Sequence, residues 1–217
     1  MYQTITLNNV LPQVFEERRS QIQSDVWLQQ FQFQKGQLYL VEAASGTGKS
    51  SLCSYIFGYR KDFTGTIAFD DRNINDLKVS EWVNARKSSL SILWQELRLF
   101  PELTAWENVM IKNNLTKGFQ PVYQLNEWFD RLGIADKKQS PIGRMSFGQQ
   151  QRVALIRSLC QPFDFLFADE PISHLDDENS RIMGEIMMSE ARKQGAGVIV
   201  TSIGKHIDLQ YDKVLKL

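Results

Sequence analysis

The sequence predicts an α/β fold with a mainly parallel β-sheet, and two observations lead to this prediction. Short apolar segments bounded by turn residues alternate with longer segments that have the character of helices. The last two helix-like segments, Ser146–Cys160 and Glu178–Gln194, adjoin short, strongly apolar segments. Because this alternation is typical of parallel strands joined by helices, we expect a parallel α/β core.

The expected elements follow the chain in order. Strands are expected at Ile5–Leu7, Gln37–Glu42, Gly65–Phe69, Ser89–Trp94, Phe163–Ala168, Gly197–Thr201 and Val214–Leu217. The clearest helices are expected at Gly48–Phe57, Ser146–Cys160 and Glu178–Gln194. Residues 96–158 are mostly helix-like and contain no convincing buried strand, so we expect a helical lobe inserted into the α/β core.

Composition and charge narrow the classes of function. The chain has 217 residues, with 25 Lys and Arg against 25 Asp and Glu, so its net charge favours neither nucleic acid nor an anionic membrane as a partner. Its two cysteines, Cys53 and Cys160, lack metal-ligand spacing, which fits a reducing compartment. No secretory signal and no apolar stretch of about 18 residues is visible. We expect one compact cytoplasmic domain that does not itself cross a membrane.

The stretch VEAASGTGKSSL, residues 41–52, has the context of a phosphate-binding loop, because an apolar strand leads into it and a helix follows it. Gly46 and Gly48 can adopt backbone angles that bring consecutive N–H groups together around an anion. The helix start adds partial positive charge. Lys49 can reach the β- and γ-phosphates, and the Ser50 hydroxyl is placed to bind Mg²⁺.

The first position of this loop departs from the usual pattern. Such loops open with glycine, whereas this chain has Ala43, which the turn accepts where its φ is negative. The alternative interpretation of the segment is an ordinary glycine turn before a helix. The candidate nucleotide contacts in the loop are Ala43, Ala44, Ser45, Gly46, Thr47, Gly48, Lys49, Ser50 and Ser51.

A second motif, FDFLFADEP, is an apolar strand that ends in two adjacent carboxylates, Asp169 and Glu170. Asp169 at the carboxyl end of the strand can hold Mg²⁺ through water, and Glu170 can polarise the water that attacks the γ-phosphate. The alternative is a solvated strand end or a helix cap. The phosphate-binding loop upstream favours the catalytic interpretation.

A third motif, RMSFGQQQRVALIRSL, again combines a turn with a helix start. Ser146, Gly148 and Gln149 can present a hydroxyl and backbone N–H groups to an anion, although serine alone is more simply a helix N-cap. One nucleotide needs only one such cradle from its own chain. We therefore expect the second cradle to complete a nucleotide bound by another copy, in a head-to-tail dimer that closes on ATP.

Together these motifs resemble the nucleotide-binding domain of the ATP-binding-cassette family over nearly the whole chain. AASGTGKS resembles the Walker A loop, FLFADE resembles Walker B, and MSFGQ resembles the signature LSGGQ. The resemblance implies a P-loop NTPase fold with a RecA-like, mainly parallel core, an N-terminal antiparallel β part and an inserted α-helical subdomain. Residues 1–217 would form one domain, with a catalytic core at 1–95 and 159–217 and the helical subdomain at 96–158.

The resemblance also implies roles for residues outside the glycine loop. Gln95 in ILWQE resembles the Q-loop glutamine, which contacts Mg²⁺ and the attacking water. Asp176 in SHLD resembles the D-loop aspartate near the site of the opposite copy. The implied ligands are ATP and Mg²⁺, with Glu170 as catalytic base. The implied partners are a second copy or a related cassette, and an integral-membrane permease subunit on another chain.

Two further departures concern the phosphate sites. Phe147 replaces a signature glycine, and Ser202 stands where the family has a histidine that contacts the γ-phosphate. Because serine is shorter and neutral, we expect Ser202 to hold the phosphate less firmly and turnover to be slow. His206 follows four positions later, and we favour a surface residue over a replacement for the missing histidine.

Two aromatic residues have open interpretations. The family stacks adenine on an aromatic residue ahead of Walker A, and Phe15 is the candidate here, with core packing as an equal alternative. Trp106 lies where cassettes receive the coupling helix of a membrane partner. Exposure of Trp106 would favour an interface, and burial would make it a core residue.

The sequence therefore predicts the ATP-hydrolysing subunit of a transporter-type membrane complex, located at the cytoplasmic face of the inner or plasma membrane. RLFPELTAWENV is most similar to the small cassettes of lipoprotein-release, macrolide-export and cell-division complexes. One alternative is a switch that closes on ATP but scarcely hydrolyses it. Another is a soluble cassette with no transport role, for which this neutral single cassette lacks the basic tracts expected of nucleic-acid binding.

Overall fold

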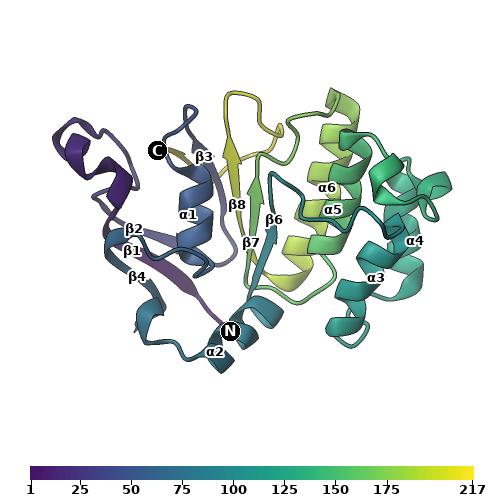
Figure 1. Ribbon diagram of the computed structural model, residues 1–217, viewed down its shortest axis with the longest axis horizontal. Helices are drawn as coiled ribbons and strands as arrows, with labels where there is room; N and C mark the ends of the chain where they lie inside the picture. Colours follow the sequence, from purple (N-terminus) through teal and green to yellow (C-terminus); the bar gives the residue numbers. More distant parts are fainter.

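The computed structural model describes residues 1–217 and contains two β-sheets with helices between and beside them (Figure 1). The first sheet is antiparallel, with the strand order β2-β1-β4-β5. Its strands are β1 (Thr4–Pro12), β2 (Gln30–Gln34), β4 (Phe63–Phe69) and β5 (Arg72–Asn73). The second sheet is parallel, with the order β6-β7-β8-β3-β9. Its strands are β3 (Leu38–Glu42), β6 (Leu90–Leu93), β7 (Phe165–Asp169), β8 (Gly197–Ser202) and β9 (Lys213–Lys216).

Six α-helices and four 3₁₀ segments connect these strands. The α-helices are α1 (Lys49–Ile56), α2 (Val79–Ser88), α3 (Ala105–Leu115), α4 (Val122–Arg131), α5 (Phe147–Ser158) and α6 (Asp177–Gln194). The 3₁₀ segments are η1 (Gln13–Gln21), η2 (Ile74–Asp76), η3 (Ala135–Lys137) and η4 (Ile142–Arg144). No helix combines the length and the apolar character that a bilayer crossing demands.

The parallel sheet is buried on both faces, as its continuous apolar strands require. Along β3, Tyr39 and Val41 face a hydrophobic cluster shared with α1 and the antiparallel sheet. Leu38 and Leu40 face the opposite way, into a cluster shared with α3 to α6. Helix α1 therefore lies between the two sheets, and α3 to α6 cover the other face of the parallel sheet (Figure 1).

The predicted parallel α/β core and the antiparallel N-terminal part are confirmed, with corrections at the antiparallel sheet. The first strand runs to Pro12, beyond the expected end at Leu7, because Asn9 (φ 51°) forms a bulge rather than a turn. Gly65 on β4 allows this bulge, since a Cβ there would lie 2.3 Å from the Asn9 carbonyl oxygen. Strands β2 and β5 were missed, although the QFQFQ sequence of β2 alternates strictly and buries Phe33.

The segment between β6 and β7 carries α3, α4 and α5, with one isolated β-bridge between Thr104 and Pro141. The boundaries between the catalytic core and the helical subdomain, at residues 95/96 and 158/159, remain a proposal. Trp106 is partly buried against the core, with its ring centroid 5.9 Å from that of Phe129, which favours the core interpretation. His206 is exposed, in line with the surface interpretation.

Candidate phosphate-binding site

The glycine-rich loop spans residues 43–48, between the end of β3 and the start of α1. Gly46 (φ 80°) and Gly48 (φ 102°) both adopt left-handed conformations that disfavour other residues. A Cβ at position 48 would also lie 3.2 Å from the rings of Phe15 and Trp27. Ala43 does not take a positive φ, and its N–H donates to the Ser202 carbonyl oxygen at 3.1 Å, so the departure from glycine is accommodated.

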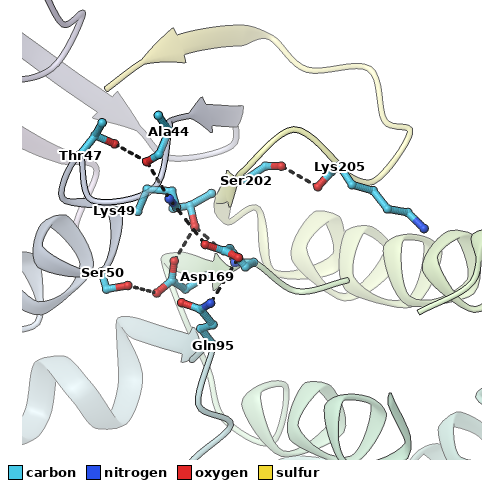
Figure 2. Close-up of polar contacts among 10 residues, drawn as sticks. Ala44, Thr47, Lys49, Ser50, Gln95, Asp169, Ser202 and Lys205 are labelled. Carbon is cyan, nitrogen blue, oxygen red and sulfur yellow. Dashed lines mark hydrogen bonds and ion pairs between the residues drawn. The ribbon is translucent and has the colours of Figure 1, made fainter. Parts of the chain in front are cut away.

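Lys49 is buried beneath this loop, with only 6% of its surface exposed. Its ammonium nitrogen donates to the Ala44 carbonyl oxygen at 3.3 Å and lies 3.5 Å from Oε1 of Glu170. Figure 2 shows Lys49 extending from the loop toward the edge of the parallel sheet. A buried cation next to exposed loop N–H groups favours the binding of a polyanion.

Asp169 stands at the end of β7 between two hydroxyl groups. Ser50 donates to its Oδ2 at 2.9 Å, and Thr201 donates to its Oδ1 at 2.5 Å. Asp169 is 1% exposed and Thr201 is fully buried. The orientation of this carboxylate is therefore fixed by strand β8 on one side and by the start of α1 on the other (Figure 2).

Glu170 follows directly, outside the strand and less buried. Its φ of 48° is unusual for a residue with a side chain. Its N–H donates to the Thr201 carbonyl oxygen at 3.2 Å. Strained backbone of this kind persists where the surrounding structure fixes it. The side chain accepts a hydrogen bond from Nε2 of Gln95 at 3.3 Å, so the two residues expected to hold the attacking water are in contact.

These side chains meet because they follow the carboxyl ends of neighbouring strands. The glycine loop leaves β3, Gln95 follows β6, and Asp169 ends β7. In an open parallel sheet this edge is where ligands bind. The sequence predicted Lys49 and Gln95 as site residues but did not predict Thr201, although its position at the polar end of an apolar strand was a usable signal.

Ser202 ends β8 and lies near this cluster, but its hydroxyl is directed elsewhere. It donates to the Lys205 carbonyl oxygen at 2.5 Å, and the residue is 1% exposed (Figure 2). A phosphate contact from Ser202 therefore requires the side chain to rotate away from the 203–206 turn.

A cavity of about 310 Å³ opens beside the glycine loop, and aromatic residues line it. Phe15 from η1 and the buried Trp27 line it with Ser45 and Thr47 of the loop. The indole N–H of Trp27 donates to the Thr47 carbonyl oxygen at 3.0 Å. The cavity thus places Phe15 next to the loop, as an adenine platform requires, and reveals Trp27 as a loop contact that sequence reasoning missed.

The second predicted anion cradle lies at the start of α5. Ser146 is the N-cap of this helix: its Oγ accepts from the Gln149 N–H, and Gln149 Oε1 accepts from the Ser146 N–H. Asp176 caps α6 in the same way, accepting from the Asn179 N–H at 2.8 Å. No hydrogen bond or ion pair joins Ser146, Gly148, Gln149 or Asp176 to the glycine loop of the same chain.

The donor set at the strand ends fits Mg²⁺ rather than a softer metal. Ser50 and Asp169 offer hard oxygen donors, and no group of three or more His, Cys, Asp or Glu side chains forms a complete protein cage. Mg²⁺ commonly takes one or two protein ligands and completes its shell with water and phosphate oxygens. The residues present are therefore compatible with a magnesium–nucleotide complex.

Comparisons with known proteins agree with this geometry. The family model for ABC transporters matches residues 29–173. The ABC transporter ATP-binding protein YtrE of Bacillus subtilis is 30% identical over 84% of this chain and 83% of its own length. The lipoprotein-releasing system ATP-binding protein LolD 1 of Caulobacter vibrioides is 30% identical over 76% of this chain and 72% of its own length.

Solved structures give the same fold. The dimeric bacterial ABC transporter cassette MJ0796 superposes with a TM-score of 0.74 at 22% identity and covers 91% of this chain and 87% of its own. An ATP-bound bacterial exporter of the Atm1 family superposes with a TM-score of 0.75 at 19% identity, over 100% of this chain and 37% of the exporter chain. The match of the family model over more than half of the chain shows that this protein belongs to the ABC transporter family.

Proposed function

We propose that the chain binds and hydrolyses ATP as a subunit of an ABC transporter complex whose membrane-spanning part is another polypeptide. The observation that carries this proposal is the convergence of Lys49, Asp169 and Glu170 at one edge of the parallel sheet. A purely structural role would not require a buried lysine and two carboxylates beneath a glycine loop. The proposed location is the cytoplasmic face of the membrane.

In this proposal the loop N–H groups and Lys49 hold the β- and γ-phosphates and neutralise charge that develops during transfer. Ser50 and Asp169 would hold Mg²⁺, which supplies charge stabilisation to the phosphate oxygens. Glu170 and Gln95 orient the attacking water, and Glu170 accepts its proton. The 3.3 Å contact between Gln95 and Glu170 supports a shared water-binding position.

A second copy completes the site. Ser146, Gly148 and Gln149 form no hydrogen bond or ion pair with the glycine loop of their own chain, and together they present a helix start suited to an anion. We propose that each ATP lies between the glycine loop of one copy and this helix start of another copy, or of a related cassette. ATP binding then closes the dimer, and loss of phosphate opens it.

Turnover is proposed to be slow because no histidine stands at position 202. The buried hydroxyl of Ser202 is already bonded to Lys205, so it offers the γ-phosphate little in its present orientation. This geometry also favours the second candidate function, a switch that closes on ATP with little hydrolysis. Glu170 and its contact with Gln95 favour hydrolysis.

The membrane partner is proposed to bind in a groove of about 340 Å³ between α2, β6 and α3, here called the α3 groove. Its exposed apolar residues are Tyr59, Phe100, Ile111 and Leu115. Its cations are Arg86, Arg98, Lys112 and Arg157, and no carboxylate lines it. A segment with apolar and acidic side chains matches this surface, in a complex similar in kind to the lipoprotein-releasing system.

Burial of two of these cations, Lys112 and Arg157, strengthens the preference for an acidic partner. Burial lowers the pKa of Arg157 to about 10, and burial together with the nearby Arg157 lowers the pKa of Lys112. Arg157 donates only to the carbonyl oxygens of Leu97 and Arg98. Arg98 is paired with Glu96 at 3.6 Å, whereas Lys112 and Arg157 form no ion pair within the chain, so an acidic partner side chain would compensate the charge of these two groups.

The test of nucleotide function is Mg²⁺-dependent phosphate release by the purified complex, compared with a Lys49→Ala variant. We expect release in the wild type and its loss, with weakened ATP binding, in the variant. Release unaffected by Lys49→Ala would contradict the assignment of the glycine loop.

The test of the partner is co-purification from membranes after the double charge reversal Arg98→Glu and Lys112→Glu, with Lys213→Glu as the control on β9, at the opposite edge of the parallel sheet from β6. We expect the double variant to lose the membrane subunit and to keep its ATP affinity. Recovery of the wild type in the soluble fraction, without a membrane protein, would favour the soluble cassette instead.

A further inference from the structure

Two aromatic rings join the start of α5 to the loop that precedes α6. Phe147, the first residue of α5, is 40% exposed, and its ring centroid lies 4.4 Å from that of His174 at an interplanar angle of 60°. Edge-to-face arrangements of this kind are the favoured geometry of aromatic pairs. The residue that replaces a signature glycine therefore has a specific contact on a different loop.

The same two segments touch at two more places. Nε2 of Gln151, one turn further along α5, donates to Ser173 Oγ at 3.2 Å, and Ser173 Oγ lies 2.9 Å from Nδ1 of His174. A Cβ at Gly148 would lie 3.0 Å from both the His174 carbonyl oxygen and Leu175 Cδ2. The backbone of the loop thus lies directly against the helix, and the two rings close the contact on the exposed side.

This arrangement leaves the Ser146 hydroxyl of the turn and the Asp176 carboxylate of the loop exposed toward a second copy. Ser146 Oγ accepts from the Gln149 N–H, so its own O–H can still donate to an anion. Asp176, at the end of the loop, is exposed beside the start of α6. Movement of either segment alone would have to break the Phe147–His174 contact.

We infer that Phe147 and His174 are a positioning pair that holds the Ser146–Gln149 turn and the 173–176 loop as one unit against the nucleotide bound by a second copy. The inference rests on the proposed function, since it assigns the pair to closure of the ATP-bound dimer. Phe147 then compensates for the glycine it replaces, because its ring fixes a turn that would otherwise depend on backbone geometry alone. Neither residue is catalytic, since each acts through Ser146 and the loop.

The test is a double-mutant cycle with Phe147→Ala, His174→Ala and the combined variant, each in the Glu170→Gln background that stops hydrolysis. The measured quantity is the dissociation constant of the ATP-induced dimer by analytical ultracentrifugation. We expect each single change to weaken the dimer by roughly 3- to 10-fold, as aromatic pairs contribute, and the double change to be no weaker than either single change. Phe119→Ala, an equally truncated exposed phenylalanine on another loop, should leave the dimer unchanged.

Two readouts separate positioning from a general structural effect. In hydrolysing protein, Phe147→Ala should lower kcat at saturating ATP while the ATP affinity of the monomer stays at the wild-type value, and Phe147→Tyr should restore kcat. Additive effects in the cycle, or a Phe147→Tyr variant as impaired as Phe147→Ala, would overturn the inference while leaving ATP binding and closure intact. Failure of the Glu170→Gln parent to dimerise with ATP would overturn the proposed function and this inference together.

Discussion

The Ser50 hydroxyl donates a 2.9 Å hydrogen bond to Asp169 Oδ2, which joins the first turn of α1 to the end of β7 across 119 sequence positions. On its other side Asp169 accepts from Thr201 at 2.5 Å. The carboxylate is thus held between two hydroxyls, one from the glycine-loop helix and one from the neighbouring strand.

Removal of the Thr201 hydroxyl should weaken the response to Mg²⁺. Thr201→Val keeps the shape of a fully buried side chain but releases Asp169 Oδ1 from its donor. We expect the Mg²⁺ concentration for half-maximal hydrolysis to rise roughly tenfold, the lower end of the effect of lost support for a metal ligand. Thr201→Ser, which keeps the hydroxyl, should behave as the wild type, and an unchanged Mg²⁺ response in Thr201→Val would contradict the assignment of Asp169.

Loss of the Trp27 indole N–H should affect nucleotide binding more than catalysis. Trp27→Phe removes the donor to the Thr47 carbonyl oxygen, together with the indole atoms Cζ2 and Nε1 that lie nearest Gly48, and keeps an aromatic ring at this position. Because one such hydrogen bond contributes about 1 kcal/mol, KM for ATP should rise about fivefold with kcat unchanged. Steady-state kinetics decide this, with Trp82→Phe on α2 as the matched control. A fall in kcat alone would show that Trp27 acts on the reaction step instead.

Truncation of Phe15 tests the adenine platform. Phe15 lines the cavity beside Thr47, where a stacked base would lie over its ring. Phe15→Ala should raise KM for ATP by roughly 2- to 10-fold, whereas Phe15→Tyr should not. If each of the two variants had the same KM for ATP as for a triphosphate without a base, Phe15 would not stack on adenine. The core-packing interpretation of Phe15 would then hold.

Introduction of histidine at position 202 tests the proposed slow turnover. We expect Ser202→His to raise kcat roughly tenfold, below the usual contribution of a positioned acid–base group because the 203–206 turn must move to admit the ring. Ser202→Ala should differ little from the wild type, since the native hydroxyl is bonded to Lys205. Thermal unfolding of each variant checks that the buried position tolerates the change. A folded Ser202→His protein with no gain in kcat would contradict the proposal.

The strand ends explain why the sequence alone could indicate that residues of the candidate site lie together. Lys49, Asp169 and Glu170 occur in short local patterns whose chemistry depends on a strand or helix boundary nearby, and those boundaries are marked by apolar runs and glycines. The parallel sheet then brings the patterns together without any further information, because the ends of its strands share one edge.

Contacts made through the antiparallel sheet and its connections could not be predicted in this way. Trp27 lies 20 positions from Thr47, in a connection without a motif, and only the packing of α1 between two sheets brings them together. The bulge at Asn9 likewise depends on Gly65 of another strand, so the local sequence resembled a turn. The pairing of Phe147 with His174 has the same origin, since it depends on where α5 meets a distant loop.

Dependence of phosphate release on Glu170 distinguishes an ATPase from a switch that only closes on ATP. Mg²⁺-dependent phosphate release should be compared between the wild type and Glu170→Gln, each purified with its membrane partner and at equal ATP occupancy. We predict clear release by the wild type and a loss of at least about 100-fold in the variant, with ATP still bound, as expected when a general base is removed. Closure on ATP without phosphate release by either protein would contradict the account and identify the chain as a switch.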